Sequence, residues 1–310
     1  MEKIKTVFIV GPTASGKTNV SINLAKKIGG EIISADSMQI YKGIHIASAA
    51  PDEEEKQGIP HHLIEFLNLN EQFSVADYVK AARKIIKEVY SRGNVPIVVG
   101  GTGLYINSLL DNTEFCEQET DYSLRNELEE KFDLIGGENM LCELAEFDSE
   151  TAARLHPNNR RRIIRAFEVY YKTGKTITEL NELSHNNESF IEPLVIGINF
   201  ENREILYERI NKRVDIMLEN GLVEEAKKTF DENQSKGAFQ AIGHKELYGY
   251  LKGEIPFEEA TDLLKQQTRR YAKRQLTWFR KDERINWLYA DKQEVLKDSV
   301  CLAENFLKEE

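Results

Sequence analysis

Residues 6–18 read TVFIVGPTASGKT, and this stretch decides the fold. The apolar, β-branched run at 6–10 is typical of a buried strand, and apolar residues at helical spacing over 18–28 indicate a helix. The segment between them, 11–18, matches the pattern G-x-x-x-x-G-K-[ST] in the strand–loop–helix context that this pattern needs. We therefore predict that the loop binds a diphosphate or a triphosphate.

Each part of this loop has a physical role in holding phosphate. Its glycines let successive backbone N–H groups point at phosphate oxygens, and the following helix adds the positive end of its dipole. Lys17 supplies a point charge, and the hydroxyl of Thr18 is a candidate ligand for Mg²⁺. The residues expected to bind the phosphates are Gly11, Pro12, Thr13, Ala14, Ser15, Gly16, Lys17 and Thr18.

The rest of the chain continues the alternation of strands and helices. A candidate helix covers 75–90, with Ser74 as its cap. Further candidate strands are the apolar runs at 31–35, 95–99, 194–198 and 285–288. This order predicts an α/β fold, a P-loop NTPase-like core with a parallel sheet flanked by helices.

One long segment breaks this alternation. Residues 113–193 have a helical pattern and no good candidate strand, although they lie between strand candidates. We therefore predict a helical insertion domain at 113–193. The core is predicted to combine residues 1–112 with residues 194–310, whose part after Asn202 is mostly helical.

Two polar residues are expected at one edge of the sheet. Asp36 follows the strand at 31–35, and Thr102 follows the strand at 95–99 within Gly100–Gly103. Because the carboxyl ends of parallel strands border the ligand crevice, both side chains are candidate site residues. Asp36 is a candidate general base or water-mediated magnesium ligand, or else a turn former. The Thr102 hydroxyl is a candidate to bind a phosphate or to reach a proton that is transferred, or else it caps the helix that follows.

Composition excludes several classes of protein. The chain has 310 residues, of which 41% are hydrophobic and 30% charged, as in soluble globular proteins of about two domains. No apolar run is long enough to cross a membrane, and no signal peptide is apparent. Cys116, Cys142 and Cys301 are too few and too far apart for a disulfide framework or a Cys-rich zinc site. We expect a cytoplasmic monomer with no membrane partner.

Charge is strongly segregated along the chain. The formal net charge is −11, yet residues 154–175 hold seven Arg or Lys and one acid. Residues 265–284 hold eight Arg or Lys and two acids, whereas residues 114–150 hold thirteen acids and two basic residues. Such segregation can produce local positive fields that attract nucleic acid, although two solvated helix faces would give the same pattern.

Eight segments, in order along nearly the whole chain, together resemble the tRNA dimethylallyltransferase (tRNA isopentenyltransferase) family in its bacterial form. They are GPTASGKT at 11–18, DSMQIYKG at 36–43, PHHL at 60–63, FSVADY at 73–78, GGTGLY at 100–105, HPNNRRRIIRAFE at 156–168, AIGHKE at 241–246 and TRRYAKRQLTWFR at 268–280. The resemblance implies transfer of a dimethylallyl group from dimethylallyl diphosphate to N6 of the adenosine 3′ of the anticodon. The loop and Mg²⁺ would then hold the pyrophosphate leaving group rather than ATP.

The resemblance also implies roles for single residues. It makes Asp36 the base that accepts the N6 proton, and it places Thr102, Arg125 and Arg213 near the donor. It also implies that the helical insertion at 113–193 binds tRNA. The contacts that it implies with the anticodon stem-loop of tRNA come from Asp36, Ser37, Met38 and Gln39, from Arg161, Arg162, Ile163, Ile164 and Arg165, and from Gln240, Ala241, Ile242, Gly243, His244 and Lys245.

The sequence departs from the family pattern at a few positions. Residues 47–50 read Ala-Ser-Ala-Ala where the family commonly has Gly-Thr-Ala-Lys, and His244 replaces a usual tyrosine. Trp278 and Phe279, at helical positions, are expected in the core rather than as platforms for a base.

Three other functions share some of these features. A small-molecule P-loop kinase would need ATP but would leave the two basic segments unexplained. An adenylate isopentenyltransferase would use the same donor with a free nucleotide as acceptor. A non-catalytic RNA-binding protein would not need Asp36 and Thr102 beside a phosphate loop.

Overall fold

The chain divides into two units in a computed structural model that describes residues 3–113, 122–185, 189–230 and 237–309. The core unit combines Met1–Leu110 with Phe190–Glu310, and the helical unit is Asp111–Ser189. Each unit has its own hydrophobic cluster, so each is described separately below.

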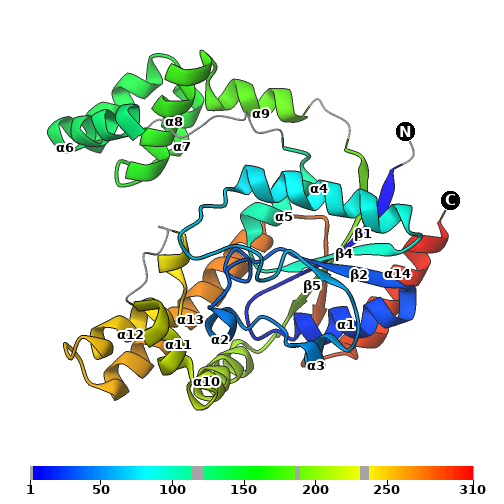
Figure 1. The fold of residues 1–310 in the computed structure, drawn as a ribbon. Helices are drawn as coiled ribbons and strands as arrows, with labels where there is room; N and C mark the ends of the chain where they lie inside the picture. Colours follow the sequence, from blue (N-terminus) through cyan, green and yellow to red (C-terminus); the bar gives the residue numbers. More distant parts are fainter. Residues whose placement is uncertain (1–2, 114–121, 186–188, 231–236, 310) are drawn as a thin grey trace. The chain divides into compact units, whose positions relative to one another are not determined.

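A parallel sheet organises the core unit (Figure 1). Within the described residues its six strands lie in the order β3-β2-β4-β1-β5-β6, and every adjacent pair is parallel. The predicted α/β fold with a helical insertion is therefore confirmed. The strands are β1 (Ile4–Val10), β2 (Gly30–Ser34), β3 (His61–His62), β4 (Val95–Gly100), β5 (Ile191–Asn199) and β6 (Ile285–Tyr289).

The predicted ends of β1, β2, β4 and β6 are within two residues of the observed ones, and two larger differences concern β5 and β3. β5 begins at Ile191, three residues earlier than predicted, so residues 191–193 continue the sheet. Pro193 argued against a strand at this point, because proline has no N–H for a central strand. β6 pairs with β5 only from Val195 onward, so at Pro193 the strand pairs with β1 alone. The edge strand β3 was not predicted, because two residues give no periodic signal.

Helices cover both faces of the sheet. On one face, α1 (Lys17–Ile28) and α14 (Val295–Lys308) pack together, with Ile22 and Ala303 in the same cluster as Val7 and Ile9 of β1. On the other face lie α4 (Val75–Ser91) and α5 (Gly103–Leu110) (Figure 1). The predicted cap of α4 is present, since Ser74 Oγ accepts the Asp77 N–H.

A second layer of helices in the core unit frames the ends of the strands. Its hydrophobic cluster joins Val214, Leu222, Leu247 and Leu264, one from each of four helices. These helices are α10 (Arg203–Glu219), α11 (Leu222–Phe230), α12 (His244–Leu251) and α13 (Phe257–Phe279), with a 3-10 turn at Ala238–Gln240 and two short helices, α2 (His45–Ser48) and α3 (Glu53–Lys56), completing the unit.

The helical unit is built around an apolar cluster of its own. Leu128, Met140, Ile163 and Phe167 are among its buried side chains. Gly136 interrupts the longest helix with a positive φ of 77°, which accounts for the kink there. The helices are α6 (Tyr122–Ala145), α7 (Ser149–Arg154), α8 (Arg160–Thr173) and α9 (Ile177–His185).

The expected positions of two neighbouring aromatic residues come out differently. Phe279 is buried as predicted, but Trp278 is 40% exposed, so its prediction as a core residue was wrong. The indole packs against Gly103, where an added Cβ would lie 2.3 Å from Trp278 Cδ1, and its Nε1 donates to Asn107 Oδ1. Packing on a glycine at the start of α5 leaves part of the ring in solvent.

Two further sequence expectations concern cysteine and the membrane. Cys142 and Cys301 are free and exposed, and Cys116 lies outside the described residues. Within the described ranges, no helix has the length and apolar character needed to cross a bilayer.

Candidate functional site

The predicted phosphate loop connects β1 to α1. β1 ends at Val10 and α1 begins at Lys17, so the loop occupies the carboxyl edge of the central strand. Gly11 has a φ of 144°, and a Cβ added there would lie 2.3 Å from the Ile198 carbonyl oxygen of β5. Gly16 has a φ of 95° and caps α1. Glycine is therefore required at both ends of the loop.

Lys17 folds back over the loop. Its Nζ donates to the carbonyl oxygens of Gly11, at 3.0 Å, and Pro12, at 2.7 Å. Burial of the ammonium group, together with the positive charge of Arg213, lowers the pKa of Lys17 to about 7, although Asp36 acts in the opposite direction. Two neighbouring cations in a partly enclosed site favour binding of an anion between them.

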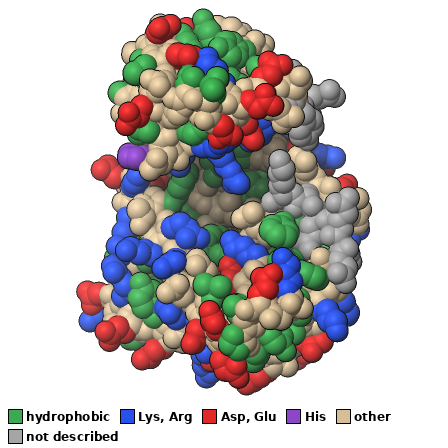
Figure 2. Space-filling view, turned by 90° about the vertical axis from the view of Figure 1, so that its left-hand side faces the viewer, with side chains coloured by type: hydrophobic (Ala, Val, Ile, Leu, Met, Phe, Trp, Pro, Cys, Tyr) green, Lys and Arg blue, Asp and Glu red, His purple; other side chains and the backbone are tan. Residues whose placement is uncertain are grey.

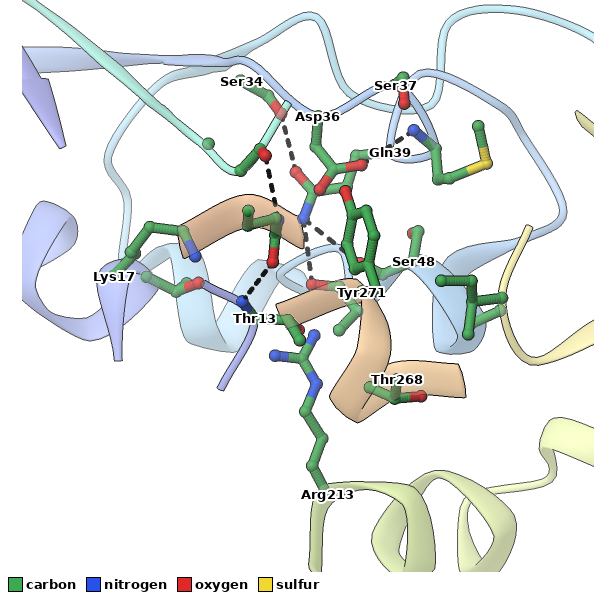
Figure 3. A pocket seen from close by; sticks show the side chains of 18 of the residues that line it. Thr13, Lys17, Ser34, Asp36, Ser37, Gln39, Ser48, Arg213, Thr268 and Tyr271 are labelled. Atoms are coloured by element: carbon green, nitrogen blue, oxygen red, sulfur yellow. Dashed lines mark hydrogen bonds between the residues drawn. The ribbon is translucent and has the colours of Figure 1, made fainter. Parts of the chain in front are cut away.

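A cavity of about 360 Å³ opens beside Lys17 (Figure 3). Residues from the loop, the end of β2, α2, α10 and α13 line it. Arg213 reaches it from α10, and burial lowers the pKa of this guanidinium while Asp36 partly compensates. The buried hydroxyl of Ser15 in the loop has no hydrogen-bond partner among the described residues, so it is available to a bound phosphate.

Asp36 and Thr102 lie at the edge of the sheet where the sequence predicts them. Asp36 lines the cavity, and its Oδ1 accepts the Met38 N–H at 2.9 Å. Thr102 Oγ1 accepts the Ser37 N–H at 3.0 Å, and its own N–H donates to the Ala35 carbonyl at 3.1 Å. The end of β4 thus fixes the backbone that carries Asp36.

Two side chains of α13 belong to the site although neither was predicted as a site residue, and both lie in the family-like segment 268–280. Gln275 joins two loops, because its Oε1 accepts the Thr13 N–H at 2.8 Å and its Nε2 donates to the Gly101 carbonyl at 3.0 Å. Tyr271 lines the cavity beside Asp36 (Figure 3). Burial raises the pKa of its phenol, and the negative charge of Asp36 raises it further. Thr268, Tyr271 and Gln275 are spaced so that they lie on one face of a helix, and this spacing was the signal that the sequence offered for them.

The stretches predicted to contact RNA in the core unit have different exposures. Ser37, Met38 and Gln39 line the cavity. In the second stretch the cavity is lined by Gln240, Ile242 and Lys245, whereas Ala241, Gly243 and His244 are buried beneath them. Figure 2 shows Lys and Arg side chains gathered on one side of this unit, and the exposed basic residues of α13 include Arg270, Lys273 and Arg274.

The remaining predicted residues belong to the helical unit. On α8, Arg161, Arg162 and Arg165 are exposed, whereas Ile163 and Ile164 are buried in the helical cluster. Arg125, on α6, places its Nε 3.4 Å from Glu129 Oε1 and 3.9 Å from Glu168 Oε1. Within this unit the three arginines of α8 are therefore exposed, and Arg125 lies near two carboxylates.

The residues present fit a magnesium ion that is held largely by its phosphate ligand. Thr18 lines the cavity at the start of α1, where its hydroxyl is the predicted ligand. No cluster of three or more His, Cys, Asp or Glu side chains suited to a metal occurs in the described part of the chain. Mg²⁺ commonly takes one or two protein oxygens and completes its shell with phosphate and water, so this sparse donor set is compatible with it.

A second cavity, of about 560 Å³, shares Lys17, Thr18 and Arg213 with the first. Arg209 and Lys212 of α10 add two further cations to its lining. Arg209 is fixed by a hydrogen bond from its Nε to the Ala14 carbonyl at 3.0 Å, and its guanidinium lies over the Phe200 ring. The phosphate loop is thus reached from two cavities, both lined by basic residues.

Comparisons with known proteins identify the family. The chain is 50% identical over 287 residues to the tRNA dimethylallyltransferase of Acetivibrio thermocellus, covering 92% of this chain and 91% of that one, and 46% identical to the Bacillus subtilis enzyme, covering 92% and 90%.

Solved structures identify the same family. The tRNA isopentenylpyrophosphate transferase of Bacillus halodurans matches with a TM-score of 0.72 and 42% identity over 99% of both chains. A eukaryotic dimethylallyltransferase acting on tRNA matches with a TM-score of 0.84 and 29% identity, over 98% of this chain and 80% of that one. The IPP transferase family model matches residues 39–282, and the chain belongs to this family of tRNA dimethylallyltransferases.

Proposed function

We propose that the enzyme transfers the dimethylallyl group of dimethylallyl diphosphate to N6 of the adenosine 3′ of the anticodon in tRNA. The observation that carries this proposal is the shared cavity, where Lys17 and Arg213 lie on one side and Asp36 on another. Cations suit a diphosphate, and a carboxylate suits an amine that must lose a proton. The names of the relatives supply the dimethylallyl group and the tRNA, and the diphosphate and the acceptor position are part of this proposal.

The cations stabilise the leaving group in this proposal. As the allylic C–O bond breaks, negative charge develops on the pyrophosphate, and the loop N–H groups, Lys17 and Arg213 stabilise that charge. Thr18 is the proposed Mg²⁺ ligand, and the ion when bound adds positive charge to the diphosphate. Thr102 and Arg125 are the other proposed donor-side residues. Thr102 would act through the backbone at Ser37, which its hydroxyl fixes.

Asp36 is the proposed general base. The adenine N6 attacks the allylic carbon, a C–N bond forms, and the proton on N6 passes to the Asp36 carboxylate. The hydrogen bond from Met38 N–H to Oδ1 orients the carboxylate. An exocyclic amine is a weak nucleophile, so removal of its proton at the moment of attack is needed.

The acceptor adenine has to leave its stack before it reaches this cavity. In the proposal, Gln39, Gln240 and Lys245 contact the flipped base or its neighbours, while Arg161, Arg162 and Arg165 contact phosphates of the anticodon stem-loop. The second cavity, with Arg209 and Lys212, is the proposed route of the donor diphosphate, so donor and acceptor reach Lys17 and Asp36 from different sides.

A single incubation tests this proposal. The protein is mixed with dimethylallyl diphosphate, Mg²⁺ and an unmodified anticodon stem-loop that carries adenine 3′ of the anticodon, and the RNA is analysed by mass spectrometry. A matched stem-loop with guanine at that position is the acceptor control, and free AMP tests the nucleotide transferase. Gain of one five-carbon unit on the first RNA alone is expected. Modification of AMP instead, or consumption of ATP with no RNA product, would contradict the proposal.

A further inference from the structure

A buried histidine lies behind the acceptor side of the cavity. His244 is the first residue of α12 and is 1% exposed. Its Nε2 lies 2.8 Å from Glu225 Oε1, and its Nδ1 lies 3.1 Å from Thr229 Oγ1, both on α11. Burial alone would raise the pKa of Glu225, but hydrogen bonds from His244 and two backbone amides lower it. The carboxylate therefore accepts, and His244 donates from Nε2.

Glu225 in turn holds the beginning of α2. Its Oε2 accepts the Ile46 N–H at 2.7 Å, and its Oε1 accepts the Ala47 N–H at 2.9 Å. Ile44, which precedes this single-turn helix, has no capping side chain. The carboxylate from α11 therefore takes the place of an N-cap residue, because it satisfies two free N–H groups and puts negative charge at the positive end of the helix.

The other end of α2 forms part of the cavity wall. Ala47, Ser48 and Ala49 line the cavity, and Gln39 Nε2 donates to the Ala49 carbonyl at 3.2 Å (Figure 3). Gln39 Oε1 accepts from Ser34 Oγ at 2.8 Å, so β2 and α2 together fix both ends of this amide. Hydrogen bonds at the two ends of α2, joined by the backbone of that helix, thus connect the imidazole to a side chain on the proposed acceptor side.

We infer that His244 is a positioning residue, which holds α2 through Glu225 and thereby orients Gln39 for the acceptor adenine. This inference rests on the proposed function, because it concerns the same cavity. His244 and Ala47 both bond to Glu225, so the buried imidazole and the cavity wall share one carboxylate. A histidine that merely fills the core would instead contribute stability alone.

Two amide substitutions separate these roles, because each reproduces one ring nitrogen. The amide nitrogen of His244→Gln can replace Nε2 and donate to Glu225, whereas His244→Asn can reach Thr229 but not Glu225. Thr229→Val is the matched control, because it removes the other hydrogen bond of the imidazole and keeps the side-chain shape. The readouts are KM for the stem-loop, KM for dimethylallyl diphosphate, kcat, and hydrogen exchange of the peptide that contains Ile46 and Ala47.

The inference predicts one pattern across these variants. His244→Asn raises KM for the stem-loop about threefold to tenfold, the range for one lost hydrogen bond, and speeds exchange at residues 46 and 47. His244→Gln restores both readouts, while donor KM stays unchanged in both variants. Thr229→Val lowers thermal stability and leaves the stem-loop KM and the exchange at 46 and 47 unchanged.

Other results would overturn it. Equal stem-loop KM and equal exchange in His244→Asn and the wild-type protein would show that the bond to Glu225 positions nothing. Loss of donor and acceptor kinetics together in all three variants would show a merely structural role. Wild-type protein that does not modify the stem-loop would overturn the proposed function instead, and the exchange readout would still report on His244 and α2.

Discussion

The donor and acceptor sides of the cavity are constructed differently. The donor side is centred on one contiguous loop, whose conformation is fixed by Gly11 and Gly16, and Arg213 of α10 adds its charge to that of Lys17. The acceptor side brings together Gln39 after β2, the short helix α2, and Lys245 on α12. Side-chain hydrogen bonds between distant segments, such as those of Gln39 and Glu225, hold that side in place.

This difference predicts how each side responds to substitution. A substitution on the donor side acts on the diphosphate directly, because the groups of the loop contact it in the proposed reaction. On the acceptor side, each hydrogen bond carries a small share of the positioning, so single losses are modest and spread over several residues. Asp36 lies between the two sides and is the sharpest place to test the comparison.

Asp36→Asn is expected to have the largest effect. Asparagine keeps the shape and the acceptor for the Met38 N–H but cannot take a proton, so turnover should fall about 10²–10⁴-fold, the range for loss of a general base. Pyrophosphate affinity should change little, because the phosphate loop is intact. Single-turnover kinetics and a pyrophosphate titration measure the two effects separately.

Asp262→Asn is the control, because it removes the same charge from an exposed position on α13. It should retain wild-type turnover. If Asp36→Asn also retained it, the base would have to be another group in the cavity.

Lys17→Met should weaken pyrophosphate binding by about 10–100-fold, the range for a lost charge-assisted hydrogen bond. The same change should raise the thermal stability of the ligand-free protein at pH 7, because a desolvated cation with a lowered pKa is replaced by an apolar side chain. Thermal shift with and without pyrophosphate reports both effects.

Lys212→Met provides the comparison for Lys17. Lys212 is exposed, and it lines the second cavity but not the first. It should leave ligand-free stability unchanged. Undiminished pyrophosphate protection in Lys17→Met would mean that the loop binds a different ligand.

The same contrast explains what the sequence could predict. The loop, its glycines and the strands with apolar runs are local patterns, and the structure confirms the fold built on them. Gln275 and Tyr271 were missed because their roles arise from packing α13 against Gly101 and Asp36, distant in sequence. Ile163 and Ile164 show a further limit, because a motif that spans a helix includes its buried face as well as its exposed one.

The exposed face of α8 gives a prediction for the RNA partner. Changing Arg161, Arg162 and Arg165 to Gln should raise the stem-loop KM and reduce the slope of log affinity against log salt by up to about 2, from about 0.7 per lost phosphate contact. Donor affinity should be unaffected. Lys227→Gln with Lys228→Gln, exposed on α11, is the control for general loss of positive charge. An unchanged slope in the α8 variant would remove this helix from the RNA surface.

The smallest expected effect is a proton taken up when pyrophosphate binds. In the free protein the pKa of Lys17 is lowered to about 7, whereas a bound diphosphate would raise it again by supplying negative charge. A fraction of the Lys17 side chains is then neutral at pH 7, so binding should take up protons at this group, and more of them at pH 8 than at pH 7. Affinity should therefore fall as pH rises above 7.

Calorimetry in buffers of different ionisation enthalpy measures this uptake. Pyrophosphate itself also titrates, so the quantity that matters is the difference between the wild-type protein and Lys17→Arg, whose guanidinium stays charged at every pH used. The wild type should take up more protons than Lys17→Arg, and the difference should grow from pH 7 to pH 8. Equal uptake at both pH values would show that Lys17 is already charged in the free loop, and the donor side would then owe its anion affinity to backbone N–H groups and Arg213.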